Sequence, residues 1–163
     1  MSSDSNAVLI TCVGATPIVV VNVYAHYLMH DELRRLRIKY VLLGASSNTI
    51  RFIDSIGRCL REVATYFGRE VPEVDYVEVD PFDIYDIWSK LRKRVVERYG
   101  DLVRVVDVTA GTKPMSIALY KLATDIDAKY VTYLSLRSRE FENLPFTDIP
   151  KYYSNIVILE RKV

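Results

Sequence analysis

The sequence has little cysteine, no glutamine and no excess of either charge. Only Cys12 and Cys59 occur in 163 residues, so a disulfide framework is excluded, and we expect reduced thiols in a cytoplasmic protein. Lys and Arg number 22 against 21 Asp and Glu, which argues against coating of nucleic acid by bulk positive charge. We therefore expect no stable binding of DNA or RNA duplexes, although one focused positive pocket remains possible.

Long apolar runs are also missing. The most apolar stretch, Ile18–Met29, is interrupted by Asn22 and His26 and is too short to span a bilayer. The first seven residues contain no Lys or Arg ahead of an apolar segment, so we expect neither a targeting segment nor a membrane partner. The absence of Gln, with 12 Tyr and many Val, Ile, Arg and Glu, is typical of a thermophilic source.

What the sequence does contain is a regular alternation of strand and helix patterns. Half of the residues are apolar, enough to bury a core in one domain over residues 1–163. Apolar runs and turn residues predict strands at Ala7–Val13, Ile38–Leu43, Val74–Val79, Leu102–Val108, Tyr130–Leu136 and Asn155–Glu160. Helices are predicted from Pro17 to about His30, from about Thr49 to Phe67, from an Asp83 cap to Gly100, and over Pro114–Thr124.

Four strand–helix units with nearly continuous apolar strands predict an α/β fold. We expect a single Rossmann-like, doubly wound domain, with a mostly parallel six-stranded sheet and helices on both faces. In such a sheet the first and fourth strands are neighbours at the switch point. The loops Gly14–Pro17 and Thr109–Pro114 should then face one another across one crevice.

The segment after the fourth strand carries the strongest chemical signal. A β-branched run, Val103–Val108, stops at Thr-Ala-Gly-Thr-Lys, and an amphipathic helix begins at Pro114. Backbone amides, two hydroxyls and the ammonium of Lys113 therefore converge at the carboxyl end of a buried strand. A helix N-terminus in this place favours an anion, so we expect a ligand that bears phosphate.

The common nucleotide motifs do not fit these loops. Gly14 is a single glycine after the first strand, and the second strand ends in Gly44 rather than in an acid, so an NAD enzyme is disfavoured. A phosphate loop would need a glycine where Val106 stands, and a metal-binding Ser or Thr where Pro114 stands. We therefore predict no cofactor and no metal.

Two loops resemble the signature motifs of a known family. Val13–Pro17 (VGATP) and Asp107–Met115 (DVTAGTKPM) are similar to those of CARF domains, the CRISPR-associated Rossmann fold, and Asp80-Pro81 fits the family pattern after the third strand. The resemblance covers nearly the whole chain in element order. Ala110 departs from it, since relatives often have a second glycine there, which indicates a backbone that is not left-handed or tolerates Ala. Ala15-Thr16 also departs, although Thr16 keeps a hydroxyl before the proline.

The resemblance implies a homodimer that binds a cyclic oligoadenylate, the second messenger of type III CRISPR immunity, on its two-fold axis. Most relatives carry an attached effector, for which this chain, ending at Val163, has no room. Stand-alone members of similar size include ring nucleases, so we expect slow, metal-independent cleavage of cyclic tetra-adenylate. The alternative is a non-catalytic sensor or sponge for the messenger, and a third possibility is a regulator that binds DNA through a partner chain.

Several residues are predicted to contact the ring. Lys113 is assigned to charge stabilisation, and Thr16 to orientation of the phosphate, as the two catalytic residues. The predicted ligand-binding set comprises Gly14, Ala15, Thr16, Pro17, Ser46, Ser47, Asn48, Thr109, Ala110, Gly111, Thr112, Lys113 and Arg137. Ser138 and Arg139 end the fifth strand at the same rim. The loop with Phe141, Phe146, Tyr152 and Tyr153 either closes over the ring or packs onto the last helix.

Simpler roles compete with these assignments. Lys113 has the alternative of capping the loop or pairing with Asp107. His26 and His30 share a helix face as metal ligands do, but no third ligand is apparent, and surface or interface positions are favoured. Lys90–Arg94 is interpreted as the solvated side of a helix rather than an RNA contact. The apolar face of Ile18–Met29 is interpreted as core or, in part, as dimer interface.

Overall fold

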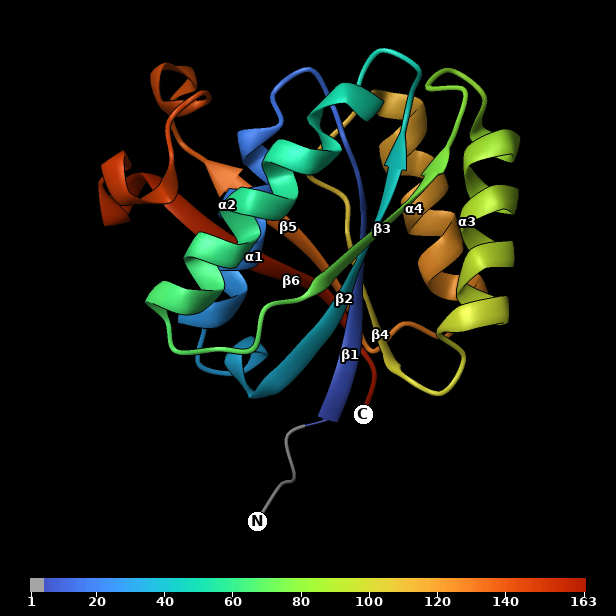
Figure 1. Ribbon diagram of the computed structural model, residues 1–163, viewed down its shortest axis with the longest axis horizontal. Coiled ribbons are helices and arrows are strands. Elements are labelled where there is room, and N and C mark those ends of the chain that lie inside the picture. The colour runs from blue at the N-terminus through green and yellow to red at the C-terminus, as the bar shows by residue number, and fades with distance from the viewer. Residues whose placement is uncertain (1–4) are drawn as a thin grey trace.

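The computed structural model describes residues 5–163, in which strands and helices alternate along the chain (Figure 1). Residues 1–4 belong to the predicted domain and to the N-terminal stretch in which no targeting segment is expected, and they lie outside the described residues. The strands are β1 (Ser5–Cys12), β2 (Leu36–Ala45), β3 (Glu73–Glu78), β4 (Val103–Asp107), β5 (Tyr130–Leu136) and β6 (Ser154–Arg161). The helices are α1 (Ile18–Met29), α2 (Ile53–Tyr66), α3 (Ile84–Arg98) and α4 (Lys113–Asp125).

The six strands form one sheet in the order β3-β2-β1-β4-β5-β6. The pairs from β3 to β5 are parallel, whereas β6 runs antiparallel to β5. The chain therefore leaves β1 in one direction to build β2 and β3, and in the other to build β4 and β5. The predicted Rossmann-like fold is confirmed, and so is the expectation that β1 and β4 are neighbours at the switch point.

Helices cover both faces of the sheet. Helices α1 and α2 lie on one face and α3 and α4 on the other (Figure 1). Along β1, Ala7 and Leu9 belong to the core under α1 and α2, while Val8 and Ile10 belong to the core under α3 and α4. Strands buried on both faces explain why their sequences are continuously apolar rather than alternating.

Helix ends follow the local sequence, with two departures from the prediction. Asp83 caps α3 as expected, because its carboxylate accepts a hydrogen bond from the Asp86 amide at 3.0 Å. The segment after β2 does not enter an α-helix at Thr49 but first makes a 3₁₀ turn, Ile50–Phe52. The fourth helix begins one residue before the proline, with Thr112 as its N-cap.

Helix α1 is buried along most of its length. Every residue from Val20 to Leu28 is buried, so this stretch is core. His26 lies inside the protein, and its predicted surface or interface position is wrong. Its Nδ1 is 2.7 Å from the Asn22 carbonyl and its Nε2 is 3.0 Å from the Ser154 hydroxyl, and burial lowers the pKa of the imidazole.

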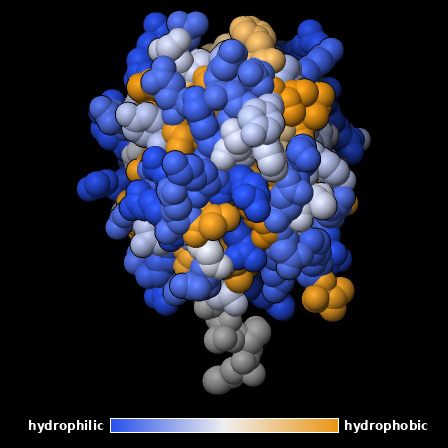
Figure 2. Space-filling view, turned by 90° about the vertical axis from the view of Figure 1, so that its right-hand side faces the viewer, coloured by the Kyte–Doolittle hydropathy of each residue, from blue (hydrophilic) through white to orange (hydrophobic). Residues whose placement is uncertain are grey.

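The face that carries α3 and α4 is mostly hydrophilic, with apolar side chains in small groups (Figure 2). In the basic run of α3, Leu91 is buried whereas Lys90, Arg92 and Lys93 are exposed. Lys90 pairs with Asp86 at 2.9 Å, which fits the solvated helix side predicted for Lys90–Arg94. In residues 5–163 no helix is both long and apolar enough to cross a bilayer.

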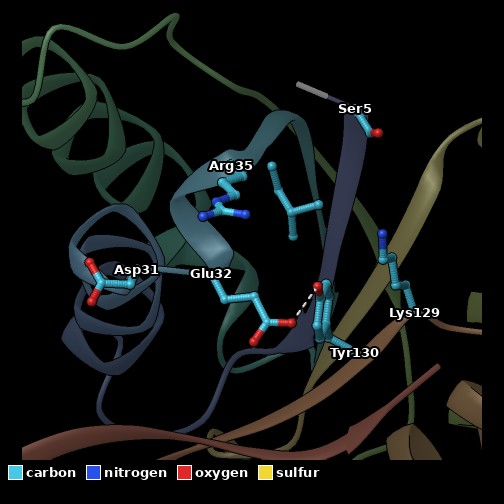
Figure 3. A pocket seen from close by; sticks show the side chains of 7 residues that line it. Ser5, Asp31, Glu32, Arg35, Lys129 and Tyr130 are labelled. Carbon is cyan, nitrogen blue, oxygen red and sulfur yellow. Dashed lines mark hydrogen bonds between the residues drawn. The ribbon is translucent and has the colours of Figure 1, made fainter. Parts of the chain in front are cut away.

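The edge of the sheet at which the parallel strands begin contains a cavity of about 430 Å³ (Figure 3). Glu32 lies beside it and accepts a hydrogen bond from the Tyr130 hydroxyl at 2.8 Å and one from Arg161 Nε at 2.7 Å. Arg161 and Tyr130 both lower the pKa of the Glu32 carboxyl. These contacts tie the α1–β2 connection to β5 and β6, at the end of the sheet opposite the two signature loops.

One carboxyl group is buried in the core. Asp107, the last residue of β4, is fully inaccessible to solvent. Its Oδ1 accepts from the Thr109 amide at 2.9 Å and its Oδ2 from the Thr132 hydroxyl at 2.7 Å, while the Tyr27 hydroxyl lies 2.5 Å from the same Thr132 oxygen. Burial raises the pKa of Asp107 to about 6, although the hydrogen bonds from Thr109 and Thr132 oppose this.

This burial predicts a dependence of stability on pH. Since the pKa in the folded state lies above its unfolded value, the folded protein binds more protons between pH 4 and 6, and this contribution to stability is lost as pH rises. We expect the free energy of unfolding of Asp107→Asn, relative to wild type, to increase by about 2 kcal/mol from pH 4 to pH 7. Denaturant titrations of both proteins at several pH values measure this difference, and a difference independent of pH contradicts the prediction.

Candidate functional site: the crossing of two loops

The loops that follow β1 and β4 touch at two glycines. A methyl group built on Gly14 would lie 2.8 Å from the Gly111 nitrogen and 3.0 Å from its Cα. Any side chain at position 14 would therefore collide with backbone. The predicted juxtaposition of Gly14–Pro17 with Thr109–Pro114 is present, and it rests on this contact.

Gly111 is required for a second reason. Its φ of +101° lies in the region that favours glycine, and a Cβ there would meet Met115 Sδ at 2.5 Å. Ala110, by contrast, has no positive φ and is buried. The departure at position 110 from the family pattern is thus accommodated, because only residue 111 turns through the left-handed region.

Two helix N-termini meet at this point. Helix α1 starts immediately after Pro17 and α4 starts at Lys113, so the partial positive ends of both helices lie at the same edge of the sheet, where the parallel strands end. Within residues 5–163 the amides of Ala15, Thr16 and Gly111 donate no hydrogen bond, and the Thr16 hydroxyl makes none. Unsatisfied donors at helix N-termini are the features that bind phosphate.

Lys113 adds a full positive charge to these donors. Its side chain is exposed, and it forms no ion pair within residues 5–163. Lys113 does not pair with Asp107, which was the alternative, because the Asp107 carboxyl is hydrogen bonded to Thr109 and Thr132 inside the core. The ammonium is therefore available to a ligand.

Two of the hydroxyls predicted to face the ligand instead hold the loop. The Thr109 hydroxyl accepts from the Leu134 amide at 2.8 Å. The Thr112 hydroxyl donates to the Pro81 carbonyl at 2.5 Å and accepts from the Met115 amide at 3.3 Å. The loop is thereby fastened to β5 on one side and to the β3–α3 connection on the other. That second link was not apparent from sequence, since nothing in Asp80-Pro81 indicates its partner.

In the turn after β2, one predicted ligand contact has a structural role and two are exposed. Ser46 is buried, and its hydroxyl lies 3.2 Å from that of Thr49, which also accepts from the Ser46 amide at 2.9 Å. The Ser46 hydroxyl therefore contributes to the structure of the turn and does not face solvent. Ser47 and Asn48 are exposed at the tip of the turn and remain available.

The rim beyond β5 is formed by the loop from residue 137 to 153 (Figure 1). Arg137 is exposed, with its guanidinium 4.4 Å from the centre of the Tyr152 ring. The loop does not pack onto α4. Phe146 contacts Phe67 beyond the end of α2, with ring centres 6.1 Å apart, and Phe141 contacts Tyr153 at 5.0 Å.

Asn22 of α1 anchors this loop, a role that sequence reasoning missed. Its amide donates to the Leu144 carbonyl at 2.9 Å and accepts from the Phe146 amide at 2.7 Å. A polar residue inside the most apolar stretch of the sequence was the available signal. Between α1, β5 and this loop lies a cavity of about 260 Å³, whose lining includes Thr109, Leu134, Leu136, Ser138, Arg139, Glu142 and Ile149.

The arrangement can bind an anion but has little acid–base chemistry. Two helix N-termini, unpaired amides and one ammonium supply positive potential at the carboxyl edge of the sheet. Asp107 is fully buried and His26 is buried and hydrogen bonded, so neither side chain reaches the surface of the loops. Within the described chain no three His, Cys, Asp or Glu residues are grouped as a metal site.

Comparisons with known proteins agree with this geometry. The sequence model of the Card1 CARF domain matches residues 55–160, whereas no curated protein sequence matches significantly. Csm6 from Enterococcus italicus, solved with cyclic hexa-2'-fluoro-hexa-dAMP, aligns with a TM-score of 0.62 and 13% identity over 94% of this chain and 41% of its own. Can2 from Sulfobacillus thermosulfidooxidans, solved with cyclic tetra-adenylate, aligns with a TM-score of 0.56 and 12% identity over 78% of this chain and 31% of its own.

At such low identity the two structures show a shared fold. The chain spans less than half the length of either one, so their complete activities belong to larger proteins. The family match rests on the sequence itself and covers more than half of the chain, including all of α3, β4, α4 and β5. The chain belongs to the Card1 CARF domain family.

Proposed function

We propose that the protein binds a cyclic oligoadenylate over the joined loops, with cyclic tetra-adenylate as the first ring to test. The observation that carries this proposal is the meeting of two helix N-termini beside Lys113, which is exposed and forms no ion pair with the described part of the chain. A ring of phosphodiesters presents several negative charges at fixed spacing, and amides and an ammonium are suited to bind them. The cavity beside Thr109 is lined by apolar and polar side chains in about equal share, among them Leu134, Ser138 and Arg139, and we assign to it the packing and edge contacts of a nucleobase.

A homodimer is part of the proposal. A ring with rotational symmetry is matched by two copies of the same loops around a two-fold axis. Helix α4 supports such an arrangement, because Ile117 and Tyr120, one and two turns beyond Lys113, are 55% and 42% exposed. Apolar side chains on the helix face that continues from the ammonium are features of an interface. Each protomer would then contribute one Lys113 to the ring.

Cleavage of the ring is proposed to need no metal. A ribose 2′-oxygen attacks the adjacent phosphorus, the bond to the 5′-oxygen breaks, and a 2′,3′-cyclic phosphate and a 5′-hydroxyl result, with the proton passing from the 2′-hydroxyl through solvent to the leaving oxygen. Lys113 stabilises charge on the phosphoryl oxygens, while Thr16 and the amides beside it hold the in-line geometry. Without a general base at the loops, turnover is slow.

The competing candidate is a sensor or sponge that binds the ring intact. The observation in its favour is that Lys113 is the only titratable side chain in the two described loops, 14–17 and 108–113. Binding alone needs only the donors that the loops already present. Both candidates use the same site and differ in whether product forms.

Incubation with labelled cyclic tetra-adenylate tests both candidates. We expect one ring bound per two chains by calorimetry, and slow accumulation of linear di-adenylate with a 2′,3′-cyclic phosphate in the presence of EDTA. Unchanged ring at stoichiometric protein removes the nuclease and leaves the sensor. No binding at micromolar concentrations of protein and ring contradicts the proposed function.

Replacement of Lys113 tests the charge at the site. Because a hydrogen bond to a charged group contributes about 1.5–3 kcal/mol, Lys113→Ala should raise the Kd at least about tenfold and lower the dependence of log Kd on log salt by about one for each lysine removed. Lys121→Ala, which removes an exposed charge near the other end of α4, is the matched control and should leave the Kd within twofold. Equal effects of the two substitutions would overturn the role of Lys113.

Replacement of Gly14 tests the contact between the loops. Gly14→Ala places a methyl group 2.8 Å from the Gly111 nitrogen, so we expect a loss of about 1–3 kcal/mol in the free energy of unfolding and weaker ring binding. Gly57→Ala, in α2, meets only Val74 Cγ2 at 3.8 Å and should be neutral or slightly stabilising. Wild-type stability and affinity in Gly14→Ala would show that the close approach does not hold the site.

A further inference from the structure

The buried carboxyl of Asp107 stands directly beneath the proposed anion site. It ends β4, and the loop of residues 108–113 begins with the next residue. Its Oδ1 accepts from the Thr109 amide, two residues into the loop. The Thr11 hydroxyl of β1 donates to the Asp107 carbonyl at 2.9 Å. The same residue therefore fixes the start of the loop through both its side chain and its backbone.

Within residues 5–163 no Lys, Arg or His side chain forms an ion pair or hydrogen bond with this carboxyl. Its two oxygens contact the Thr109 amide of the loop and the Thr132 hydroxyl of β5, the Tyr27 hydroxyl of α1 lies behind Thr132, and the Thr11 hydroxyl of β1 binds the backbone carbonyl of Asp107. Tyr27 is the one titratable group among them, and burial together with the Asp107 charge raises its pKa well above the usual range. An ionised Asp107 accepts from the Thr132 hydroxyl, which leaves the Thr132 oxygen to accept from Tyr27.

We propose that Asp107 is a positioning residue that holds the 108–113 loop, and that its carboxylate takes up a proton from solvent when a polyanionic ligand binds above it. The inference deepens the proposed function and rests on it. It assigns to the site a linkage between ligand affinity and pH that neither Lys113 nor the backbone amides provide.

The physical reason is repulsion between two negative groups. A phosphodiester bound at the amides of the two loops adds negative charge near a carboxylate that has no counter-ion and little solvent around it, which favours the protonated acid. The acid keeps both contacts: one oxygen still accepts from the Thr109 amide, and the acid hydroxyl donates to the Thr132 oxygen, whose own hydrogen then turns to the Tyr27 oxygen. Uptake of the proton therefore relieves the repulsion without releasing the loop.

The pKa of Asp107 places this exchange in an accessible range. It is raised to about 6 in the ligand-free protein, and a further increase of about one unit on binding corresponds to a tenfold change in affinity. Calorimetric titrations of cyclic tetra-adenylate at pH 6.5, in two buffers that differ in enthalpy of ionisation, should report uptake of about half a proton per protomer. The Kd should rise about tenfold between pH 5.5 and 8.

Two substitutions separate positioning from titration. Asp107→Asn resembles the protonated acid, since its oxygen accepts from Thr109 and its amide donates to Thr132. We expect a Kd that is independent of pH and about tenfold lower than that of wild type at pH 8. Asp107→Ala loses both contacts and the titrating group, so its Kd should be independent of pH and about tenfold higher than that of Asp107→Asn. The rest of the chain is unchanged in both variants, so a pH dependence of the Kd that persists in them does not come from Asp107.

Each outcome decides one point. Heats that are equal in the two buffers, or an Asn variant whose Kd follows pH as wild type does, overturn the proton linkage. An Ala variant that folds and binds as tightly as the Asn variant overturns the positioning role, and if the Ala variant does not fold, the Asn variant still tests the linkage. A wild-type protein that does not bind the ring at any pH overturns the proposed function, and the linkage with it.

Discussion

The close approach of Gly14 and Gly111 is the constraint on which the rest of the site depends. Strands β1 and β4 are hydrogen-bonded neighbours, so the loops that leave them must either diverge or pass within van der Waals contact. They pass in contact because neither residue has a side chain. That contact brings the N-termini of α1 and α4 together, and it places the ammonium of Lys113 beside amides that belong to a different strand–helix unit. Positive potential is thus concentrated in a protein whose charges are otherwise balanced.

Sequence patterns predicted the architecture well because the strands are buried on both faces. All six strands and four helices lie where apolar runs and turn residues indicated, and β5 matches its predicted range, Tyr130–Leu136. The ends were less predictable. The turn at Ile50–Phe52 precedes α2 because Thr49 bonds back to Ser46, a side-chain contact that periodicity does not reveal.

The position of the site was predictable from sequence, but which of its hydroxyls bond within the protein and which stay available to a ligand was not. Thr109, Thr112 and Thr16 are alike in sequence, yet the hydroxyls of the first two bond to Leu134 and Pro81, and the Thr16 hydroxyl makes no hydrogen bond within residues 5–163. Partners 25 and 31 residues away depend on the tertiary fold. The same reason explains Asp107, which sequence placed merely at the start of a motif. Asp107 is buried because α1 covers this part of the sheet. Its ionisable carboxyl holds the start of the 108–113 loop through the Thr109 amide.

The two hydrogen bonds of Asn22 bear on how a ligand enters. They join the middle of the 137–153 segment to a helix whose first turn belongs to the proposed phosphate site, and both are partly buried. The 137–153 segment is therefore not free to move independently of α1. A shift of the first turn of α1 toward a bound ring would therefore move Leu144 and Phe146, 8 and 10 residues beyond the end of β5, without any change in the sheet.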